Sequence, residues 1–399
     1  MSILPSSQSS TAVRIASILP VLVLASMVGP LALNIIMPSL PGFPATFHTT
    51  KETAQLTLSL FLAGMALSQI LLGPLADRFG RKPVLVSAMA LFVAMTSLAI
   101  FATSINVLIV ARFFQAFGAA AGLSISRAML RDLFPRERAA SMIGYVTMGM
   151  GVAPMIAPAL GGFLDEQFGW QAIFQACLLL GIVALVACFV VLPETRPQSL
   201  QSAGFADVFR RSVGLLKKPA FLGYALSSAF AGAMFFSFVG AAPYLVVETL
   251  KLPKDVYGLW FVIIAVGYMV GNFLSGRFSQ RVGISRMIAA GNALGVICGV
   301  LITVLSLIGI FTPAALFVPA FIMSIGNGLV LPSAISAAVS VDVQAAGAAS
   351  GLTGFLQAGI GGIATYLAGA IVSGSALPVA LLMLMFSALA IAAMRLTRA

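Results

Sequence analysis

Twelve apolar runs follow one another along the chain and constrain its fold more than any other feature. A helix of about 20 apolar residues spans the hydrocarbon core of a bilayer. Only 8% of the residues are charged, against about a quarter in soluble proteins, so these runs lack the polar faces of a soluble enzyme. We therefore predict an all-α integral membrane protein with 12 transmembrane helices, at about residues 15–37, 52–72, 83–102, 106–128, 139–163, 170–192, 220–244, 256–276, 285–309, 313–337, 345–372 and 375–394.

The connections are mostly short, except for a basic, proline-containing segment that separates six spans from six. The polar start, followed by Arg14 and an apolar run, resembles a signal peptide. However, the run exceeds the roughly 7–15 residues of an h-region, so we expect an uncleaved first span. The predicted organisation is a cytoplasmic tail (1–14), an N-terminal six-helix bundle (15–192), a cytoplasmic linker (193–219) and a C-terminal six-helix bundle (220–396).

Basic residues gather at the connections on one side of the predicted bundle, and the net charge is +11. The other side holds only Lys51, Lys251 and Lys254. Because cytoplasmic loops of membrane proteins are rich in Lys and Arg, we predict a multi-pass protein with both termini cytoplasmic. The positive charge thereby has a topological cause, and no nucleic-acid partner is expected.

The two halves of the chain are alike at an offset of 203 residues. The stretch LLGPLADRFG ends at Gly80, and FLSGRFSQRVG ends at Gly283. Two six-span halves in this relation resemble the parallel repeats of major facilitator transporters. The resemblance implies two six-helix bundles around a central cavity, with spans 1, 2, 4 and 5 facing spans 7, 8, 10 and 11.

Residues 73 to 85, GPLADRFGRKPVL, concentrate charge between two apolar runs. A positive-inside turn explains the basic residues but gives Asp77 no role. The stretch resembles the major facilitator signature G-x-x-x-D-R-x-G-R-K, which implies that Asp77 braces the halves on the cytoplasmic side in the outward-facing state. Asp132 would be a second carboxylate beside Arg81. The predicted gating residues are Gly73, Asp77, Arg78, Gly80, Arg81, Lys82 and Asp132.

Span 4 contains Arg112, with Gln115 three residues later on the same helix face. A charge within the bilayer is costly unless it faces protein or water. Two interpretations stay open. Arg112 snorkels to the outer interface, or it faces the central cavity, as the resemblance of R-x-x-Q-x-x-G to the family's span-4 motif implies.

Span 5 contains GMGVAPMIAPALGGF, whose prolines and glycines a membrane helix tolerates. It is either a kinked packing helix or the antiporter motif of drug-efflux transporters, which usually ends G-P-x-x-G-G. It resembles that motif except at Ala157, where the motif has Gly. The motif favours export over uptake, and its predicted gating residues are Pro154, Pro158, Gly161 and Gly162.

Nearly the whole chain resembles the bicyclomycin- and chloramphenicol-resistance (Bcr/CflA) group of drug:proton antiporters. The supporting stretches are NIIMPSLPGFP, QLTLSLFLAGMALSQILLGPLADRFGRKP, RFFQAFGAAAG, APMIAPALGG, GWQAIF and LPETR. The resemblance implies a monomer in the bacterial inner membrane that exports small drugs by proton antiport and alternating access, with the proton gradient as energy source and no cofactor. Its expected partners are the drug, protons and the lipid bilayer.

One position departs from the group. Asn34 stands where the group commonly has an acid, four residues before Pro38, and no other carboxylate falls near the midplane. We therefore predict neutral or anionic cargo, phenicol-like in character. The predicted cavity residues are Asn34, Phe61, Arg112, Gln115, Met150, Phe235, Phe236 and Gln357, although the aromatic members are equally explained by packing within the bundles.

Two other function classes are alternatives to drug export. An uptake symporter or facilitator for a small metabolite would need denser polar groups than this membrane interior offers. A membrane enzyme would need clustered His, Cys or acidic residues, whereas Cys177, Cys188 and Cys298 lie in apolar runs and His48 is the one histidine. We expect neither an enzyme nor a metal site.

Overall fold

The computed structural model describes residues 6–197, 205–342 and 345–398. Twelve of the helices in these ranges are long and apolar enough to cross a membrane, which confirms the predicted class. The N-terminal half comprises α1 (Ser6–Asn34), a short turn η1 (Met37–Gly42), α2 (Phe43–Thr46), α3 (Lys51–Phe79), α4 (Arg81–Ile100), α5 (Ile105–Leu133), α6 (Arg136–Phe168) and α7 (Gln171–Val191).

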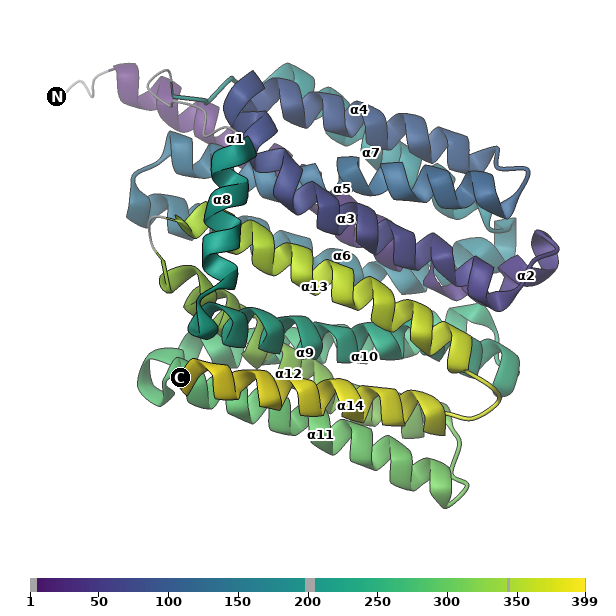
Figure 1. Cartoon of the computed structure of the whole chain (residues 1–399). Coiled ribbons are helices and arrows are strands. Elements are labelled where there is room, and N and C mark those ends of the chain that lie inside the picture. The colour runs from purple at the N-terminus through teal and green to yellow at the C-terminus, as the bar shows by residue number, and fades with distance from the viewer. Residues whose placement is uncertain (1–5, 198–204, 343–344, 399) are drawn as a thin grey trace, which may run out of the picture.

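The C-terminal half follows a short connecting helix, α8 (Phe205–Leu216). Its elements are α9 (Pro219–Tyr244), η2 (Leu245–Thr249), α10 (Lys254–Val282), α11 (Ile284–Leu307), α12 (Pro313–Ser340), α13 (Ala346–Ile371), α14 (Leu377–Ala393) and η4 (Met394–Arg398). Helix α8 crosses one end of the molecule, roughly perpendicular to the other helices (Figure 1). Leu215 anchors it against the C-terminal half. The sequence interpretation treated this segment only as a linker, and residues 198–204 of it lie outside the described ranges.

The two halves meet along two pairs of helices. Helix α13 packs along α3, and α10 packs along α6. In Figure 1 the N-terminal half lies above the C-terminal half, and both chain ends and α8 lie at the left. We call that end the basic side and the other end the opposite side.

The internal repeat appears in the helix boundaries. Helices α3 and α10 both begin and end 203 residues apart, and each has 29 residues. Each ends at a glycine in the left-handed region, Gly80 with φ 99° and Gly283 with φ 91°, a conformation that only glycine adopts at little cost. The two turns are therefore built alike.

Several helices run further than the apolar runs predicted. Helix α3 continues to Phe79, so Asp77 and Arg78 lie in its last turn rather than in a loop. Helix α5 likewise continues to Leu133 and includes Asp132. Among the residues that the structure describes, the acids of the membrane helices all fall in terminal turns, in agreement with the expectation from the sequence.

Candidate functional site

A charge cluster on the basic side centres on Arg81, the first residue of α4. Its Nη1 lies 2.5 Å from Asp77 Oδ1, and its Nε donates to Asp132 Oδ2 at 3.0 Å. The Arg81 side chain is only 8% exposed. One buried guanidinium therefore links the ends of α3 and α5, as the sequence predicted for Asp132.

A third carboxylate, Glu194, completes the cluster from the segment after α7. Its carboxylate accepts the backbone N–H of Arg81 at 2.9 Å and of Lys82 at 3.2 Å. These N–H groups lie in the first turn of α4 and have no partner within the helix, so they favour an anion. Burial opposes its ionisation, but the backbone N–H groups of Arg196, Arg81, Lys82 and Thr195 outweigh it and hold the pKa of Glu194 below its usual value. The sequence interpretation gave Glu194 no such role.

The cluster joins elements of one half only. Asp77, Arg81, Asp132 and Glu194 belong to α3, α4, α5 and the segment after α7, all in the N-terminal half. In this conformation Asp77 therefore stabilises the N-terminal half internally. Bracing of the two halves by Asp77 in another conformation stays a prediction.

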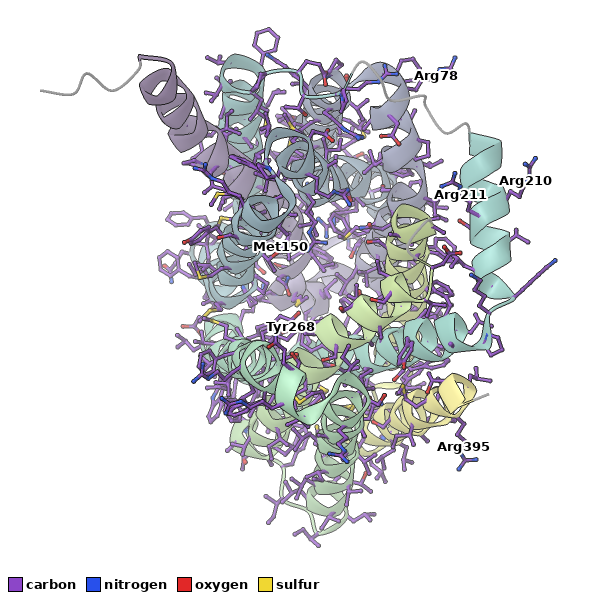
Figure 2. All side chains as sticks on the ribbon, turned by 90° about the vertical axis from the view of Figure 1, so that its left-hand side faces the viewer. Arg78, Met150, Arg210, Arg211, Tyr268 and Arg395 are labelled. Carbon is purple, nitrogen blue, oxygen red and sulfur yellow. The ribbon has the colours of Figure 1, made fainter. Side chains whose placement is uncertain are left out.

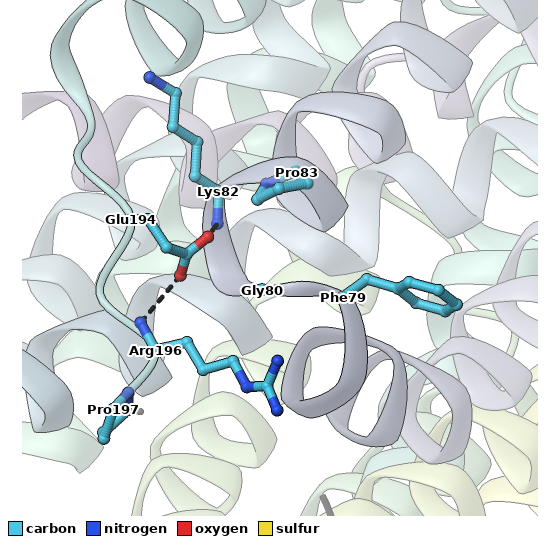
Figure 3. A pocket seen from close by; sticks show the side chains of 7 residues that line it. All are labelled: Phe79, Gly80, Lys82, Pro83, Glu194, Arg196 and Pro197. Atoms are coloured by element: carbon cyan, nitrogen blue, oxygen red, sulfur yellow. Dashed lines mark hydrogen bonds between the residues drawn. The ribbon is translucent and has the colours of Figure 1, made fainter. Parts of the chain in front are cut away.

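The remaining basic residues of the motif lie at the surface. The guanidinium of Arg78 lies 5.2 Å from the Phe79 ring, and Lys82 Nζ lies 5.7 Å from the Phe189 ring. An open pocket of about 560 Å³ lies between this turn and the segment after α7 (Figure 3). It is lined by Phe79, Gly80, Lys82, Pro83, Glu194, Arg196 and Pro197.

Arg112 is completely buried inside the N-terminal half. Its Nη1 donates to Gln115 Oε1 at 2.6 Å, and Gln115 Nε2 in turn donates to Thr96 Oγ1 of α4 at 2.7 Å. The guanidinium carbon lies 4.0 Å from the centre of the Phe61 ring of α3, a cation–π contact. Arg112 is 0% exposed, so it does not snorkel to the interface.

The hydrogen-bond partners of Arg112 all lie within the N-terminal half. The partners of Arg112 come from α3 and α5, and Gln115 extends the network to α4, away from the C-terminal half. The Nη2 atom has no hydrogen-bond partner among the described residues. Whether cargo reaches Arg112, Gln115 and Phe61 stays a prediction.

The other predicted cavity residues lie apart from this network. Asn34 ends α1 toward the opposite side and donates to Pro30 O at 2.7 Å. The rings of Phe235 and Phe236 on α9 are 5.5 Å apart, and Gln357 of α13 packs against α9 at Gly232. Met150 is half-buried on α6 and is labelled in Figure 2.

The proline and glycine motif of α6 serves close packing. The helix continues through Pro154 and Pro158 from Arg136 to Phe168. Gly161 faces the backbone of Ile35, directly after α1, and Gly162 faces the backbone of α10 at Lys254. Small residues let membrane helices approach closely, so this end of α6 joins both halves.

On the opposite side, two ion pairs join the halves, and we call them the clasp. Lys51 of α3 pairs with Glu248 of η2, and Lys254 Nζ of α10 lies 2.8 Å from Asp165 Oδ2 of α6. The Asp165 side chain is only 5% exposed. The sequence interpretation missed the clasp, although Lys51 and Lys254 are themselves related by the 203-residue offset and gave a usable signal.

Toward the basic side, Arg127 of the N-terminal half lies near the C-terminal half. Arg127 of α5 lies near Tyr268 of α10, and Figure 2 labels Tyr268 in a view from this side. The Nε of Arg127 is buried without a hydrogen-bond partner among the described residues.

Reversing one charge of the clasp should open the opposite side. We expect Lys254→Glu to increase the open population at least tenfold, because breaking a buried pair leaves an uncompensated charge that costs about 3–5 kcal/mol, reduced here by the partial exposure of Lys254. Distances between spin labels at the opposite-side ends of α4 and α11 would measure the open population.

Two further variants test whether the effect is specific to the clasp. Lys251→Glu changes an exposed lysine on the same side and is the matched control. The swap Asp165→Lys/Lys254→Asp should restore closure.

Comparisons with known proteins agree on one family. A family model described as the Major Facilitator Superfamily matches residues 22–366. The chain is 30% identical over 343 residues to the bicyclomycin resistance protein homolog of Haemophilus influenzae, covering 85% of each. It is 27% identical over 354 residues to multidrug resistance protein D of Escherichia coli, covering 86% of each. The solved structure of a bacterial homolog of the human lysosomal transporter Spinster, inward-facing and occupied, has a TM-score of 0.71 at 17% identity and covers 96% of both chains.

Proposed function

Since the chain belongs to the major facilitator superfamily and its relatives include drug-resistance proteins, we propose that it exports small drugs or antibiotics by proton antiport and alternating access. Membership of this family makes it a transporter rather than an enzyme, as the motifs predicted. We place it in a bacterial inner membrane as a monomer, with the basic side facing the cytoplasm.

The clasp is the observation that carries the proposal. A carrier must close one side of the membrane while the other is accessible, and here two ion pairs between the halves hold the opposite side closed. The charge cluster at Arg81 stays within one half, so it does not tie the halves together on the basic side. The arrangement supports a state that takes up cargo from the cytoplasm and releases it after the clasp separates.

The charges of the interior favour neutral or anionic cargo. Arg112 and Arg127 place two guanidinium groups within the membrane helices, and the carboxylates of these helices all lie in terminal turns. In a medium of low dielectric constant, repulsion of a cationic drug by a guanidinium costs several kcal/mol. A phenicol-like antibiotic, which carries no positive charge, avoids this cost.

Proton coupling then falls to acids at the helix ends. A guanidinium is effectively always protonated, so neither Arg112 nor Arg127 carries the proton. Asp77, Asp132 and Glu52 are the acids that we propose for this step. The first two share Arg81, so a proton on either would weaken the charge cluster.

Vesicle transport tests cargo class, direction and coupling together. We expect inverted vesicles containing the chain to accumulate chloramphenicol and not a cationic dye under an imposed pH gradient, and a protonophore to abolish accumulation. Uptake in the reverse direction would instead support a metabolite symporter. Strong transport of the dye by the unmodified chain would contradict the proposed cargo class.

Adding an acid at position 34 should widen the range of cargo. We expect Asn34→Asp to admit the cationic dye, because a carboxylate there offsets the positive potential of the interior. Asn34→Ala removes the amide without adding charge and serves as the control. Dye transport that is the same in both variants would contradict the electrostatic argument.

A further inference from the structure

Three polar side chains where the halves meet are buried without a complete set of hydrogen bonds. The carboxamide oxygen of Gln55 and the hydroxyls of Ser59 and Tyr244 have no partner among the described residues. The three residues are 0%, 6% and 1% exposed. Buried polar atoms are nearly always hydrogen-bonded, so each such group calls for an explanation.

Gln55 and Ser59 belong to one face of α3 that contacts the other half. Gln55 Nε2 donates to Thr365 O of α13 at 3.0 Å. A Cβ added at Gly369 would lie 2.6 Å from Gln55 Cδ, so α13 approaches this side chain closely. Ser59 follows one turn later on the same face, where α13 approaches again at Gly362.

Tyr244 extends this region to α9. Gly240, one turn before it, also contacts the Gln55 side chain. Lys51 Nζ of the clasp lies 5.7 Å from the centre of the Tyr244 ring, and Lys51 precedes Gln55 by one turn of α3. The unpaired groups therefore lie together beside the clasp, and we call this region the polar seam.

The polar seam is costly to keep closed. Each unpaired group gives up hydrogen bonds to water, which disfavours the closed state by about tenfold per group. Other buried hydroxyls are paired, since Ser237 and Ser324 each donate to a carbonyl one turn earlier at 2.9 Å. Separation of the halves would let water hydrogen-bond to these groups and remove this cost.

We propose that Gln55, Ser59 and Tyr244 line a polar exit path that opens on the opposite side and through which cargo leaves. The proposal rests on the proposed export function and adds its release route. The path presents neutral donors and acceptors, so it suits uncharged molecules with hydroxyl, amide or nitro groups.

Thiol labelling from the opposite side tests the path without requiring export. In membrane vesicles that expose this side, we expect the Ser59→Cys variant to react with a membrane-impermeant maleimide about tenfold faster than the Ser237→Cys variant. Ser237 is the matched control because its buried hydroxyl has a hydrogen-bond partner. The unmodified chain, whose three cysteines are buried, gives the background. Equal rates for the two variants would overturn the proposal.

Two tyrosine variants give a second, directional measurement. Tyr244→Phe removes an unpaired hydroxyl, so it should favour the closed seam and slow labelling of the Ser59→Cys chain by about tenfold. Tyr257→Phe removes a hydroxyl that donates to Met37 Sδ across the halves at 3.6 Å, so it should not slow labelling. An unchanged or faster rate in Tyr244→Phe would also overturn the proposal.

Chloramphenicol export by the same vesicles separates this inference from the proposed function. Fast labelling of Ser59→Cys in a chain that exports no drug supports the path and rejects drug export. Export by the Ser59→Cys chain without labelling supports drug export and rejects the path.

Discussion

Asp77→Asn is expected to lose nearly all export while the protein inserts and accumulates normally. The carboxylate of Asp77 holds Nη1 of the nearly buried Arg81, and a charge-assisted hydrogen bond contributes about 1.5–3 kcal/mol. If Asp77 also braces the halves in the outward-facing state, as the motif predicts, loss of a contact of this strength there would change the balance between conformations by roughly ten- to a hundredfold. Drug accumulation in vesicles, normalised to protein abundance, is the measurement.

Two variants show whether the effect of Asp77→Asn is specific. Asp77→Glu keeps the carboxylate and should retain part of the export. Glu166→Gln neutralises an exposed acid on the opposite side and should export normally. Full export by Asp77→Asn would reduce the charged motif to a topology signal.

Replacement of Arg112 should also have a large effect, even by lysine. The guanidinium donates to Gln115 and lies on the ring of Phe61, and lysine lacks the planar group of donors that makes both contacts. Loss of one charged hydrogen bond, about 1.5–3 kcal/mol, predicts at least a tenfold fall in export for Arg112→Lys and a larger one for Arg112→Ala.

Stability and binding must be separated for these variants, because the network also packs the N-terminal half. Arg277→Lys, at an exposed position on the basic side, is the matched control. Thermal unfolding reports the structural contribution, and chloramphenicol binding to the purified protein reports the contribution to cargo recognition. Wild-type export by Arg112→Ala would exclude both roles.

The sequence predicted the fold well because its signals are local or periodic. Apolar runs placed the twelve helices, and the 203-residue offset placed Gly80 and Gly283 in equivalent turns. The two acids beside Arg81 were predictable, because Asp77 lies four residues before it and Asp132 lies at the same-side end of span 4, whereas Glu194 was not.

The remaining features depend on the packing of distant helices. The sequence places Arg112 and Gln115 on one face but does not say which neighbour that face meets, and the structure turns it toward α4 through Thr96. The clasp partners are also remote, since Lys254 and Asp165 are 89 residues apart in the chain. The sequence also does not show that the Tyr244 hydroxyl lacks a hydrogen-bond partner, because this depends on how α9 packs at the polar seam.

The clasp has a consequence for the electrical work of transport. Each of its pairs joins opposite charges at the same end of the helices, so separating them moves no net charge through the membrane field. The membrane voltage, worth about 2.3 kcal/mol per elementary charge per 100 mV, therefore does no work on the opening step itself. If the chain exchanges neutral cargo for protons, as we propose, the voltage acts on the cycle through the protons alone.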